Sequence, residues 1–435
     1  MTLTQSYEEK RYLLISQLYK RSNTSVASRA YTYDTLGRPL TRTTARNGQT
    51  VNDSFGYNSR SELTTATVNG GAYAYDYDNI GNRLSSQSSA GEEADAAITK
   101  YTANNLNQYT ALTVDGDVDF QPEYDADGNQ TRVKTSTGIW AVNYDSENRP
   151  IDFYRIDSTG GTTVHCTYDH MGRRTTKMVT VGNNVTLHQR YIYRGYLQIA
   201  CIDLTRSHHP ALWFITWDPT QPVATRPLAI QKDGTWYTYG WDLTKNICEL
   251  YGQHGYIRTA YTYTPYGQVT AEGDVTQPIQ WSSEFNDTEL GLIYYNYRHY
   301  NPVDGRWIGR DKIVEMEYLK LLVYNYGDNS PLALLDVLGL DSFSCNKANV
   351  NRYKDLIVRV YLQTFDGYYD VVDTKNADIG QLLKKAIIDK SKGNAILSPD
   401  KFAIMRLKRL PEYFAQASYS AVEELYKSKA YQEKN

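Results

Sequence analysis

The chain has 435 residues and a formal net charge of −3 at pH 7, so its overall charge does not indicate a polyanion partner such as nucleic acid. Its length is sufficient for two or three domains. Forty tyrosines, against nine phenylalanines and seven tryptophans, predict a β-rich protein, because tyrosine favours strands whose faces are both partly wet. Four cysteines are scattered without a Cys-x-x-Cys pair, which argues for free thiols rather than a metal site or disulfide framework: Cys166, Cys201, Cys248 and Cys345.

The N-terminal residues 1–24 precede the first repeat, and one hypothesis is that they continue an upstream shell. They lack the basic-then-apolar order of a signal peptide. No apolar run approaches the ~20 residues that a membrane-spanning helix needs. We therefore expect a protein that is cytoplasmic until release, or one that becomes secreted or surface-exposed through a specialised route.

Residues 25–280 contain a repeat centred on Tyr-Asp or Tyr-Asn, with spacings of 24, 20, 47, 20 and 24 residues. The gap of 47 is about two periods, and the degenerate segment 102–110 fills it. Later variants contain Tyr191, Tyr237 and Tyr261. The aligned tyrosines are Tyr33, Tyr57, Tyr77, Tyr124, Tyr144 and Tyr168.

Each repeat predicts a β-hairpin. Tyr31 and Tyr33 follow the two-residue period of a strand. Asp34 is expected to start the turn by bonding its own backbone, and Gly37 to supply a positive φ. Residues 38–44 then return as a second strand. Because one hairpin cannot bury its own faces, the units are expected to stack into a continuous sheet.

These motifs resemble the YD repeats of the RHS family over about residues 25–340. The resemblance implies sheets that spiral into a hollow β-cocoon around a C-terminal polypeptide, with the tyrosines in structural roles. The predicted fold is therefore mainly β, with YD-repeat hairpins forming a spiralling β-sheet shell, or partial β-cocoon. A small α+β or mostly α C-terminal domain is expected to follow.

Residues 281–340 resemble the RHS repeat-associated core and its junction with the C-terminal domain. The sequence from Trp281 to Asp311 reads WSSEFNDTELGLIYYNYRHYNPVDGRWIGRD. In segment 321–340, Tyr324, Gly327, Asn329 and Pro331 are in register with the end of that core. The residues that match its first part are Glu289, Leu290, Gly291, Leu292, Tyr294, Tyr295, Tyr297, Arg298, Tyr300, Asn301, Pro302, Gly305, Arg306 and Trp307.

The resemblance also implies self-cleavage by two aspartates, carried over as Asp311, with Arg310 supporting it, and Asp336. The implied cut lies between Leu340 and Asp341. Two carboxylates about 3 Å apart cannot both ionise, so one keeps a proton. One can then activate water while the other protonates the scissile amide. The chain is thus a candidate intramolecular aspartyl autoprotease.

Both aspartate motifs depart from the Asp-Pro-x-Gly pattern of the family. After Asp311 the chain reads Lys312-Ile313-Val314, without Pro or Gly, and after Asp336 it loses Pro but keeps Gly-Leu. Lys312 also adds a cation that favours an ionised carboxylate. The alternative is an uncut boundary at which the two aspartates cap turns.

Composition changes after Leu340, which predicts a separate domain over residues 341–435. That segment holds 3 of the 29 glycines, and its charge is +4 against −7 for the preceding residues. Strands are predicted at 356–362 and 368–372, and helices at 378–389 and 399–410, with a final amphipathic helix around 421–426.

The family carries a variable domain at this position, often a toxin, but the residues identify no activity. All seven histidines precede residue 300, which excludes His-Asn-His nucleases and zinc deaminases with a histidine ligand. Cys345 is interpreted as a structural thiol. No metal and no cofactor are predicted. Two clusters are more typical of solvated surface than of metal or phosphate binding: Asp366, Asp370 and Asp373, and the basic set Lys401, Arg406, Lys408 and Arg409.

The leading functional hypothesis is a shell that encloses a variable effector and releases it by self-cleavage, in interbacterial competition or toxin delivery. The alternatives are a structural or cell-surface repeat protein, or a truncated remnant of a larger RHS gene, each with an inert tail. The expected partners are the chain's own C-terminal domain, another RHS shell segment and an immunity protein. Carbohydrate binding has no sequence support. A second shell segment is expected because residues 25–340 are few to close a cavity around 341–435.

Overall fold

The computed structural model describes residues 1–89, 98–219, 226–311, 323–339 and 341–344. The predicted strands and helices of the C-terminal domain, Cys345, its acidic and basic clusters and Lys312 lie outside the described residues. The chain forms two compact units. The first comprises Met1–Tyr191, Ala200–Thr216 and Pro227–Asn346, and the second comprises Ile192–Ile199, Trp217–Arg226 and Lys347–Asn435.

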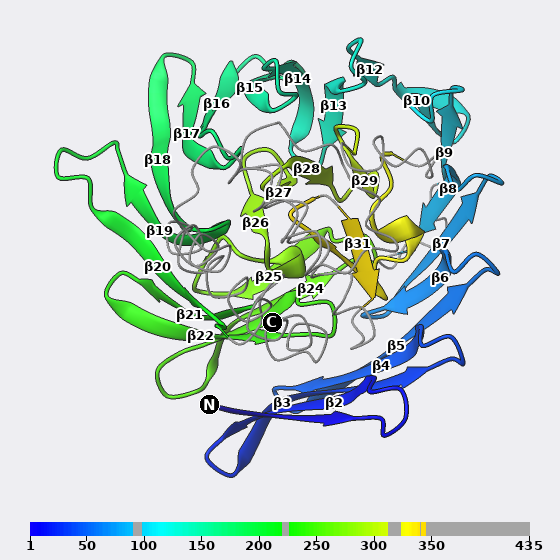
Figure 1. Cartoon of the computed structure of the whole chain (residues 1–435), viewed down its shortest axis with the longest axis vertical. Helices are drawn as coiled ribbons and strands as arrows, with labels where there is room; N and C mark the ends of the chain where they lie inside the picture. The colour runs from blue at the N-terminus through cyan, green and yellow to red at the C-terminus, as the bar shows by residue number, and fades with distance from the viewer. Residues whose placement is uncertain (90–97, 220–225, 312–322, 340, 345–435) are drawn as a thin grey trace, which may run out of the picture. The chain divides into compact units, whose positions relative to one another are not determined.

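The described residues form two large antiparallel sheets in which each strand pairs with its neighbours in the chain (Figure 1). The predicted mainly β architecture of stacked hairpins is confirmed. The first sheet has 11 strands: β1 (Thr2–Tyr7), β2 (Leu14–Arg21), β3 (Thr24–Tyr33), β4 (Pro39–Arg46), β5 (Gln49–Tyr57), β6 (Leu63–Val68), β7 (Gly71–Tyr77), β8 (Arg83–Ser88), β9 (Ile98–Ala103), β10 (Tyr109–Val114) and β11 (Asp117–Phe120).

The second sheet has 14 strands, again in chain order: β12 (Glu123–Tyr124), β13 (Gln130–Thr135), β14 (Gly138–Tyr144), β15 (Pro150–Arg155), β16 (Thr162–Tyr168), β17 (Arg174–Val181), β18 (Asn184–Arg194), β19 (Leu197–Asp203), β20 (Ala211–Trp217), β21 (Pro227–Lys232), β22 (Thr235–Trp241), β23 (Ile247–Tyr251), β24 (Ile257–Tyr263) and β25 (Val269–Gly273). Two smaller sheets follow. One contains β26 (Phe285–Asp287), β27 (Leu292–Tyr295), β28 (Arg298–Asn301) and β29 (Arg306–Trp307); the other pairs β30 (Leu334–Val337) with β31 (Asp341–Ser344). Short 3₁₀ turns span Trp281–Ser283 and Gly327–Asn329.

Each of the six aligned repeat tyrosines is the last residue of its strand. The strand pairing shifts register immediately before each of them, as at Thr32/Tyr33 and Thr167/Tyr168. Such bulges bend a strand and increase its twist. The repeat therefore carries a source of sheet curvature as well as a turn.

The repeat turns are held by the Asp or Asn that follows each tyrosine. Asp34 Oδ1 accepts the backbone N–H groups of Leu36 and Arg38, both at 2.9 Å, and Arg38 Nε binds Asp34 Oδ2. Gly37 has the expected positive φ of 82°. The residue four positions on also reaches the next turn, since Arg38 Nη1 donates to the Asn58 carbonyl at 3.0 Å. Consecutive turns are thereby joined along one end of the hairpins.

The tyrosine hydroxyls join consecutive hairpins. Tyr168 OH donates to the Pro150 carbonyl and Tyr144 OH to the Gln130 carbonyl, each at 2.8 Å. Tyr33 OH, Tyr77 OH and Tyr263 OH donate to carbonyls of the preceding hairpin in the same way. The structural role predicted for these tyrosines is thus to hydrogen-bond the backbone of the preceding hairpin.

Segments 281–311 and 323–339 pack against both large sheets. Near the repeat turns, Arg306 Nη2 donates to the Asn107 carbonyl at 2.7 Å, and Asn329 Nδ2 donates to the Gly81 carbonyl at 2.7 Å. Tyr324 OH donates to the Gly128 carbonyl at 2.7 Å. One apolar cluster joins β13–β17 to this segment: Val133, Trp140, Val142, Phe153, Val164, Cys166 and Val179 with Leu290, Leu292 and Ile308.

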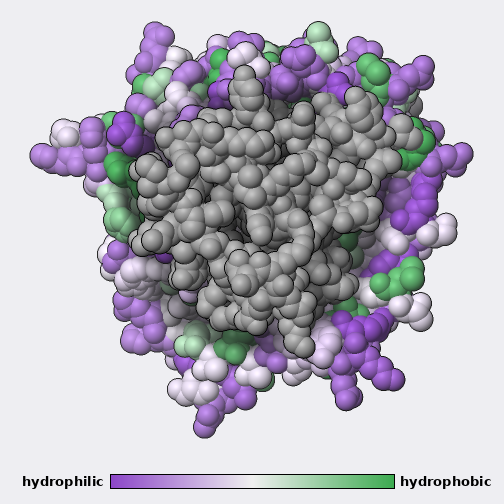
Figure 2. All heavy atoms as spheres, viewed as in Figure 1, coloured by the Kyte–Doolittle hydropathy of each residue, from purple (hydrophilic) through white to green (hydrophobic). Residues whose placement is uncertain are grey.

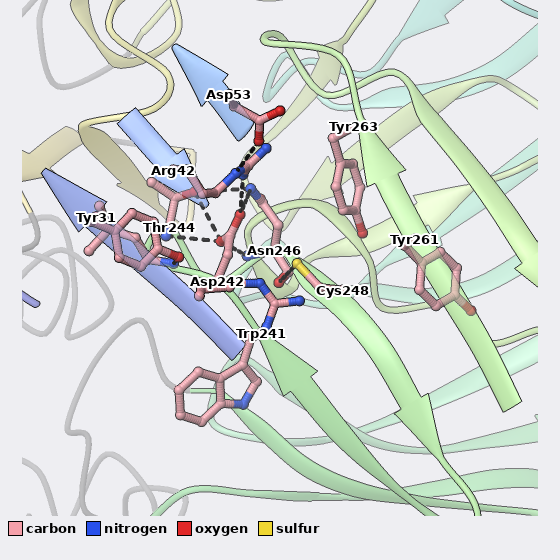
Figure 3. A network of polar contacts seen from close by, with 12 residues as sticks. Tyr31, Arg42, Asp53, Trp241, Asp242, Thr244, Asn246, Cys248, Tyr261 and Tyr263 are labelled. Atoms are coloured by element: carbon pink, nitrogen blue, oxygen red, sulfur yellow. Dashed lines mark hydrogen bonds and ion pairs between the residues drawn. The ribbon is translucent and has the colours of Figure 1, made fainter. Parts of the chain in front are cut away.

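The first strands of the chain also contact β22–β24, forming a seam between the two large sheets. Figure 3 shows Arg42 between the carboxylates of Asp53 and Asp242, at 2.8 and 3.3 Å. Arg29 and Glu249 form a fully buried ion pair beside this network. The seam therefore joins segments about 200 residues apart by polar contacts.

The described surface visible in the space-filling view is mainly hydrophilic at its margin, with isolated hydrophobic residues between (Figure 2). The second unit contributes few described residues. Within it, Trp217 Nε1 donates to the Gln198 carbonyl at 2.8 Å, and Gln198 Nε2 donates to Tyr193 OH at 3.0 Å. Among the described residues, no helix has the length and apolar character required to cross a bilayer.

Candidate functional site

The two predicted catalytic aspartates lie together, on opposite sides of one guanidinium group. Arg298 Nη2 is 2.8 Å from Asp311 Oδ2 and 3.2 Å from Asp336 Oδ2. All three side chains are at least nine-tenths buried. Residues separated by 13 and 38 positions from Arg298 thus meet at a single nitrogen atom.

Each member of the group comes from a different element of the core. Arg298 is the first residue of β28, and Asp336 lies within β30. Asp311 follows β29, and its backbone N–H donates to the Val323 carbonyl at 3.0 Å. Strand pairing and this backbone bond therefore position the charges, although the Asp-Pro motifs are absent.

The chain turns back toward the aspartates just after β30. Arg298 Nε donates to the Gly339 carbonyl, one residue before the predicted cut, and Tyr297 N–H donates to the Leu338 carbonyl at 3.2 Å. Gly339 has φ +74°, and a Cβ there would lie 3.1 Å from both Tyr295 Cβ and its carbonyl oxygen. Glycine is thus required where the chain passes Tyr295.

Aromatic rings exclude water from one side of the guanidinium. Its Cζ lies 4.0 Å from the centre of the Trp307 ring, a cation–π geometry. Trp307 packs edge-on against Tyr295, and Tyr295 OH and Tyr326 OH are 3.0 Å apart. Burial raises the pKa of the Tyr326 hydroxyl above its usual value. The guanidinium and the two carboxylates therefore lie in surroundings of low polarity, where electrostatic interactions are stronger than in water.

A small cavity of about 40 Å³ borders Arg298. Arg298, Arg310, Asn129 and Asn148 are among the side chains that line it. Since a water molecule needs roughly 10–15 Å³ measured in this way, the cavity has room for a few. Its lining mixes these polar residues with apolar ones such as Pro150 and Ile308, so a water molecule there would have polar partners.

The structure distinguishes the two arginines near Asp311. Arg310, predicted to support the site, is exposed, and its side chain passes over Gly128 in a repeat turn. Arg298 bridges the aspartates instead. Sequence reasoning placed Arg298 in the core motif but gave it no role, because its contacts depend on how β28 and β30, which belong to different sheets, pack together.

Other buried charges surround the core. Asp287 binds Arg174 Nη1 at 2.6 Å and Lys177 Nζ at 2.9 Å, which hold the pKa of its carboxyl well below the usual range. Burial raises the pKa of the Asp304 carboxyl to about 6, although Arg83 and Arg306 oppose the change. Cys166, Cys201 and Cys248 are buried free thiols, as predicted. In the described residues, no group of three or more His, Cys, Asp or Glu side chains is placed to hold a metal ion.

Stacked tyrosine-rich hairpins, joined by hydrogen bonds between their turns and packed on an aromatic core, define a repetitive β-shell protein. The chain belongs to the Teneurin YD-shell family, whose model matches residues 1–332. The predicted relationship to YD-repeat proteins is thereby confirmed.

Curated relatives include toxin components. The chain is 22% identical over 396 residues to "Toxin subunit YenC1" of Yersinia entomophaga, covering 85% of this chain and 39% of the relative. It is 23% identical over 326 residues to "tRNA3(Ser)-specific nuclease WapA" of Bacillus spizizenii, covering 72% and 12%. The chain therefore spans well under half the length of these relatives.

A solved structure shares the fold. The crystal structure of TcdB2-TccC3 without its hypervariable C-terminal region matches with a TM-score of 0.63 and 20% identity. The match covers 78% of this chain and 18% of that one. At this identity the likeness establishes the shell fold.

Proposed function

We propose that this chain is part of a toxin shell that cuts itself between Leu340 and Asp341, separating residues 341–435 from the shell. The observation that carries the proposal is the placement of Arg298 on both aspartates and on the Gly339 carbonyl. A structural boundary does not require two buried carboxylates on one guanidinium, because buried ion pairs are costly to desolvate.

The chemistry is a hydrolysis without a metal or cofactor. Water attacks the Leu340 carbonyl carbon, and one aspartate accepts a proton from that water. The other aspartate, protonated in the reacting state, gives its proton to the Asp341 nitrogen as the amide bond breaks. Arg298 stabilises the remaining carboxylate and, through the Gly339 carbonyl, fixes the chain beside the pair. The products are a new carboxylate on Leu340 and a new amine on Asp341.

The biological role follows from the relatives, two of which are named as a toxin subunit and a nuclease. In our proposal the shell encloses residues 341–435 as an effector for toxin delivery or competition between bacteria. Because the relatives are much longer, a further shell segment completes the enclosure. An immunity protein protects the producing cell, and export uses a specialised route.

Intact-mass analysis of the purified full-length chain tests the self-cleavage. We expect two species, 1–340 and 341–435, from the natural sequence. Asp311→Asn and Asp336→Asn should each give one uncut chain, because Asn can neither accept nor supply the required proton. Asp328→Asn is the matched control: Asp328 is an exposed aspartate of the same core, with φ 50°, and Asn tolerates that conformation.

A single full-length species from the natural sequence, unchanged in both variants, would contradict the proposal. Expression of residues 341–435 in a bacterium tests the effector role separately. Growth arrest is expected, whereas healthy growth with soluble fragment would favour a structural shell with an inert tail.

A further inference from the structure

We infer that β30 is a docking strand that retains residues 341–344 after the chain is cut, so release of the downstream polypeptide requires a second, unpairing step. This inference rests on the cut position proposed above. It concerns a different property of the same site, namely what holds the product once the covalent bond is gone.

The proposed cut lies in the loop between the two paired strands, β30 before it and β31 after it. β31 pairs antiparallel with β30 in the register Val337↔Asp341, Asp336↔Ser342, Leu335↔Phe343 and Leu334↔Ser344. The bond between Leu340 and Asp341 lies where the loop meets β31. Breaking that bond therefore removes none of the four residue pairs.

β30 is fixed to the core independently of β31. Asp336 is bound by Arg298, and Leu335 is 5% exposed. The backbone N–H of Leu334 donates to the Ser330 carbonyl at 3.0 Å. At the other end of the strand, the Leu338 carbonyl accepts the Tyr297 N–H. The docking strand is thus held in place whether or not the downstream chain is still connected.

The cut changes how strongly β31 is held. In the intact chain a short loop keeps the two strands at high effective concentration, and cutting the loop removes that advantage. The four pairs remain, so the fragment becomes a bound but dissociable strand. This type of contact is the strand addition by which extended peptides bind sheet edges.

The direction of the chain determines how the tether opens. The downstream polypeptide leaves β31 at Ser344, whose partner Leu334 is the pair farthest from the cut. A force applied to the downstream chain therefore breaks the pairs one at a time, beginning at Leu334–Ser344. Spontaneous loss requires all four pairs to open together. The geometry favours retention at rest and release when the fragment is pulled or unfolded.

Hydrogen exchange on the full chain tests this inference. A recognition sequence for a sequence-specific protease is inserted between Leu340 and Asp341 in the Asp311→Asn background, which leaves β30 unchanged, so that added protease, and not self-cleavage, makes the cut. Exchange of the amides of residues 341–344 is measured before and after cutting. We expect protection in both states, weaker by a factor of ten or more after the cut. Exchange at the rate of a free peptide in either state would overturn the inference.

Proline variants test the consequence for release. Ser342→Pro and Phe343→Pro change adjacent residues, and adjacent N–H groups on a strand point in opposite directions, so one of the two removes a bond to β30. After protease cutting, that variant should lose fragment 341–435 on size exclusion under conditions where the parent retains it. Ala348→Pro, beyond β31, is the control and should retain the fragment. Retention in both strand variants would show that other contacts hold the product and would refute the tether.

Discussion

The repeat tyrosines act through their hydroxyl groups as much as through their rings. Tyr33, Tyr77, Tyr144, Tyr168 and Tyr263 each donate to a backbone carbonyl of the preceding hairpin. A buried carbonyl without a partner costs free energy, and phenylalanine cannot supply that donor. This requirement explains why these five positions hold tyrosine and not phenylalanine.

Tyr168→Phe tests the hydroxyl directly. It removes the donor to the Pro150 carbonyl and leaves the ring in place. We expect the free energy of unfolding to fall by about 1 kcal/mol, measured from the urea midpoint. Tyr154→Phe, at a tyrosine that is 41% exposed, should have no measurable effect. Equal effects in the two variants would contradict this role of the hydroxyl.

Arg298 is the residue on which the candidate site depends. Arg298→Lys keeps the charge, but one compact ammonium cannot replace the planar fork that reaches both aspartates and the Gly339 carbonyl. We expect no self-cleavage in this variant by intact mass. Arg298→Met leaves two buried carboxylates without their cation and should lower the free energy of unfolding by about 3–5 kcal/mol. A cut that persists in Arg298→Lys would show that bridging is not required.

At the scale of the element, the hairpin turn tolerates two side chains at its first position. Asp145 Oδ1 accepts the N–H groups of Glu147 and Arg149 at 2.9 and 3.0 Å. In the repeat that has Asn in place of Asp, Asn58 Oδ1 accepts the N–H groups of Arg60 and Glu62 at 3.0 Å. The shared requirement is an acceptor oxygen on a short side chain.

Substitution of Asp145 should follow that requirement. Asp145→Asn keeps the acceptor but loses the ion pair with Arg149, which is partly exposed, so the free energy of unfolding should fall by less than about 1 kcal/mol. Asp145→Ala removes the acceptor and should cost about 1–2 kcal/mol. Thermal unfolding of the two variants, measured under the same conditions, compares these two losses of stability. An alanine variant as stable as the asparagine variant would refute the proposed turn chemistry.

The hairpins were predictable from the sequence because their signals are local. The alternation of Tyr31 and Tyr33, the acceptor Asp34 and the positive φ of Gly37 all lie within seven residues. The bridge from Arg298 to Asp311 and Asp336 was not predictable, since it depends on the packing of segments from different sheets, up to 38 residues apart in the chain. The family motif supplied the two aspartates. It could not show which of Arg298 and Arg310 faces them.

At the scale of the whole molecule, buried charges connect distant segments and make stability depend on pH. Asp304 is 4% exposed, and among the described residues its Oδ1 has no hydrogen-bond partner. Its pKa of about 6 in the folded state lies above the value of 3.8 expected when unfolded. The folded state therefore binds the extra proton, and this contribution to stability, complete below pH 4, is lost as pH rises through 6.

Asp304→Asn isolates that contribution. The amide stays neutral and can still accept the Asn301 Nδ2 hydrogen bond that Asp304 Oδ2 accepts at 3.0 Å. We expect the variant to be more stable than the natural chain at pH 7.5, by up to about 3 kcal/mol, and the difference to shrink to about 1 kcal/mol at pH 4.5 and to vanish as pH falls below the unfolded-state pKa of 3.8. His299, whose pKa burial lowers to about 3, acts in the opposite direction below pH 6.5 in both proteins and cancels in the comparison. A difference independent of pH would contradict the assignment.

The seam between the first strands and β22–β24 depends on a buried ion pair between residues far apart in the chain. Arg29 and Glu249, 220 positions apart, are both fully buried, so neither charge can turn to water if its partner is lost. Arg29→Met should lower the free energy of unfolding by up to about 3–5 kcal/mol, because it leaves the buried Glu249 carboxylate with only the longer contact to Arg46, at 3.7 Å, as its ion pair. The double variant Arg29→Met/Glu249→Gln should recover much of that loss in urea unfolding, since it leaves no buried charge without a partner. If the seam opened with little cost, both variants would unfold at the urea midpoint of the natural chain, and the two sheets would not depend on this contact.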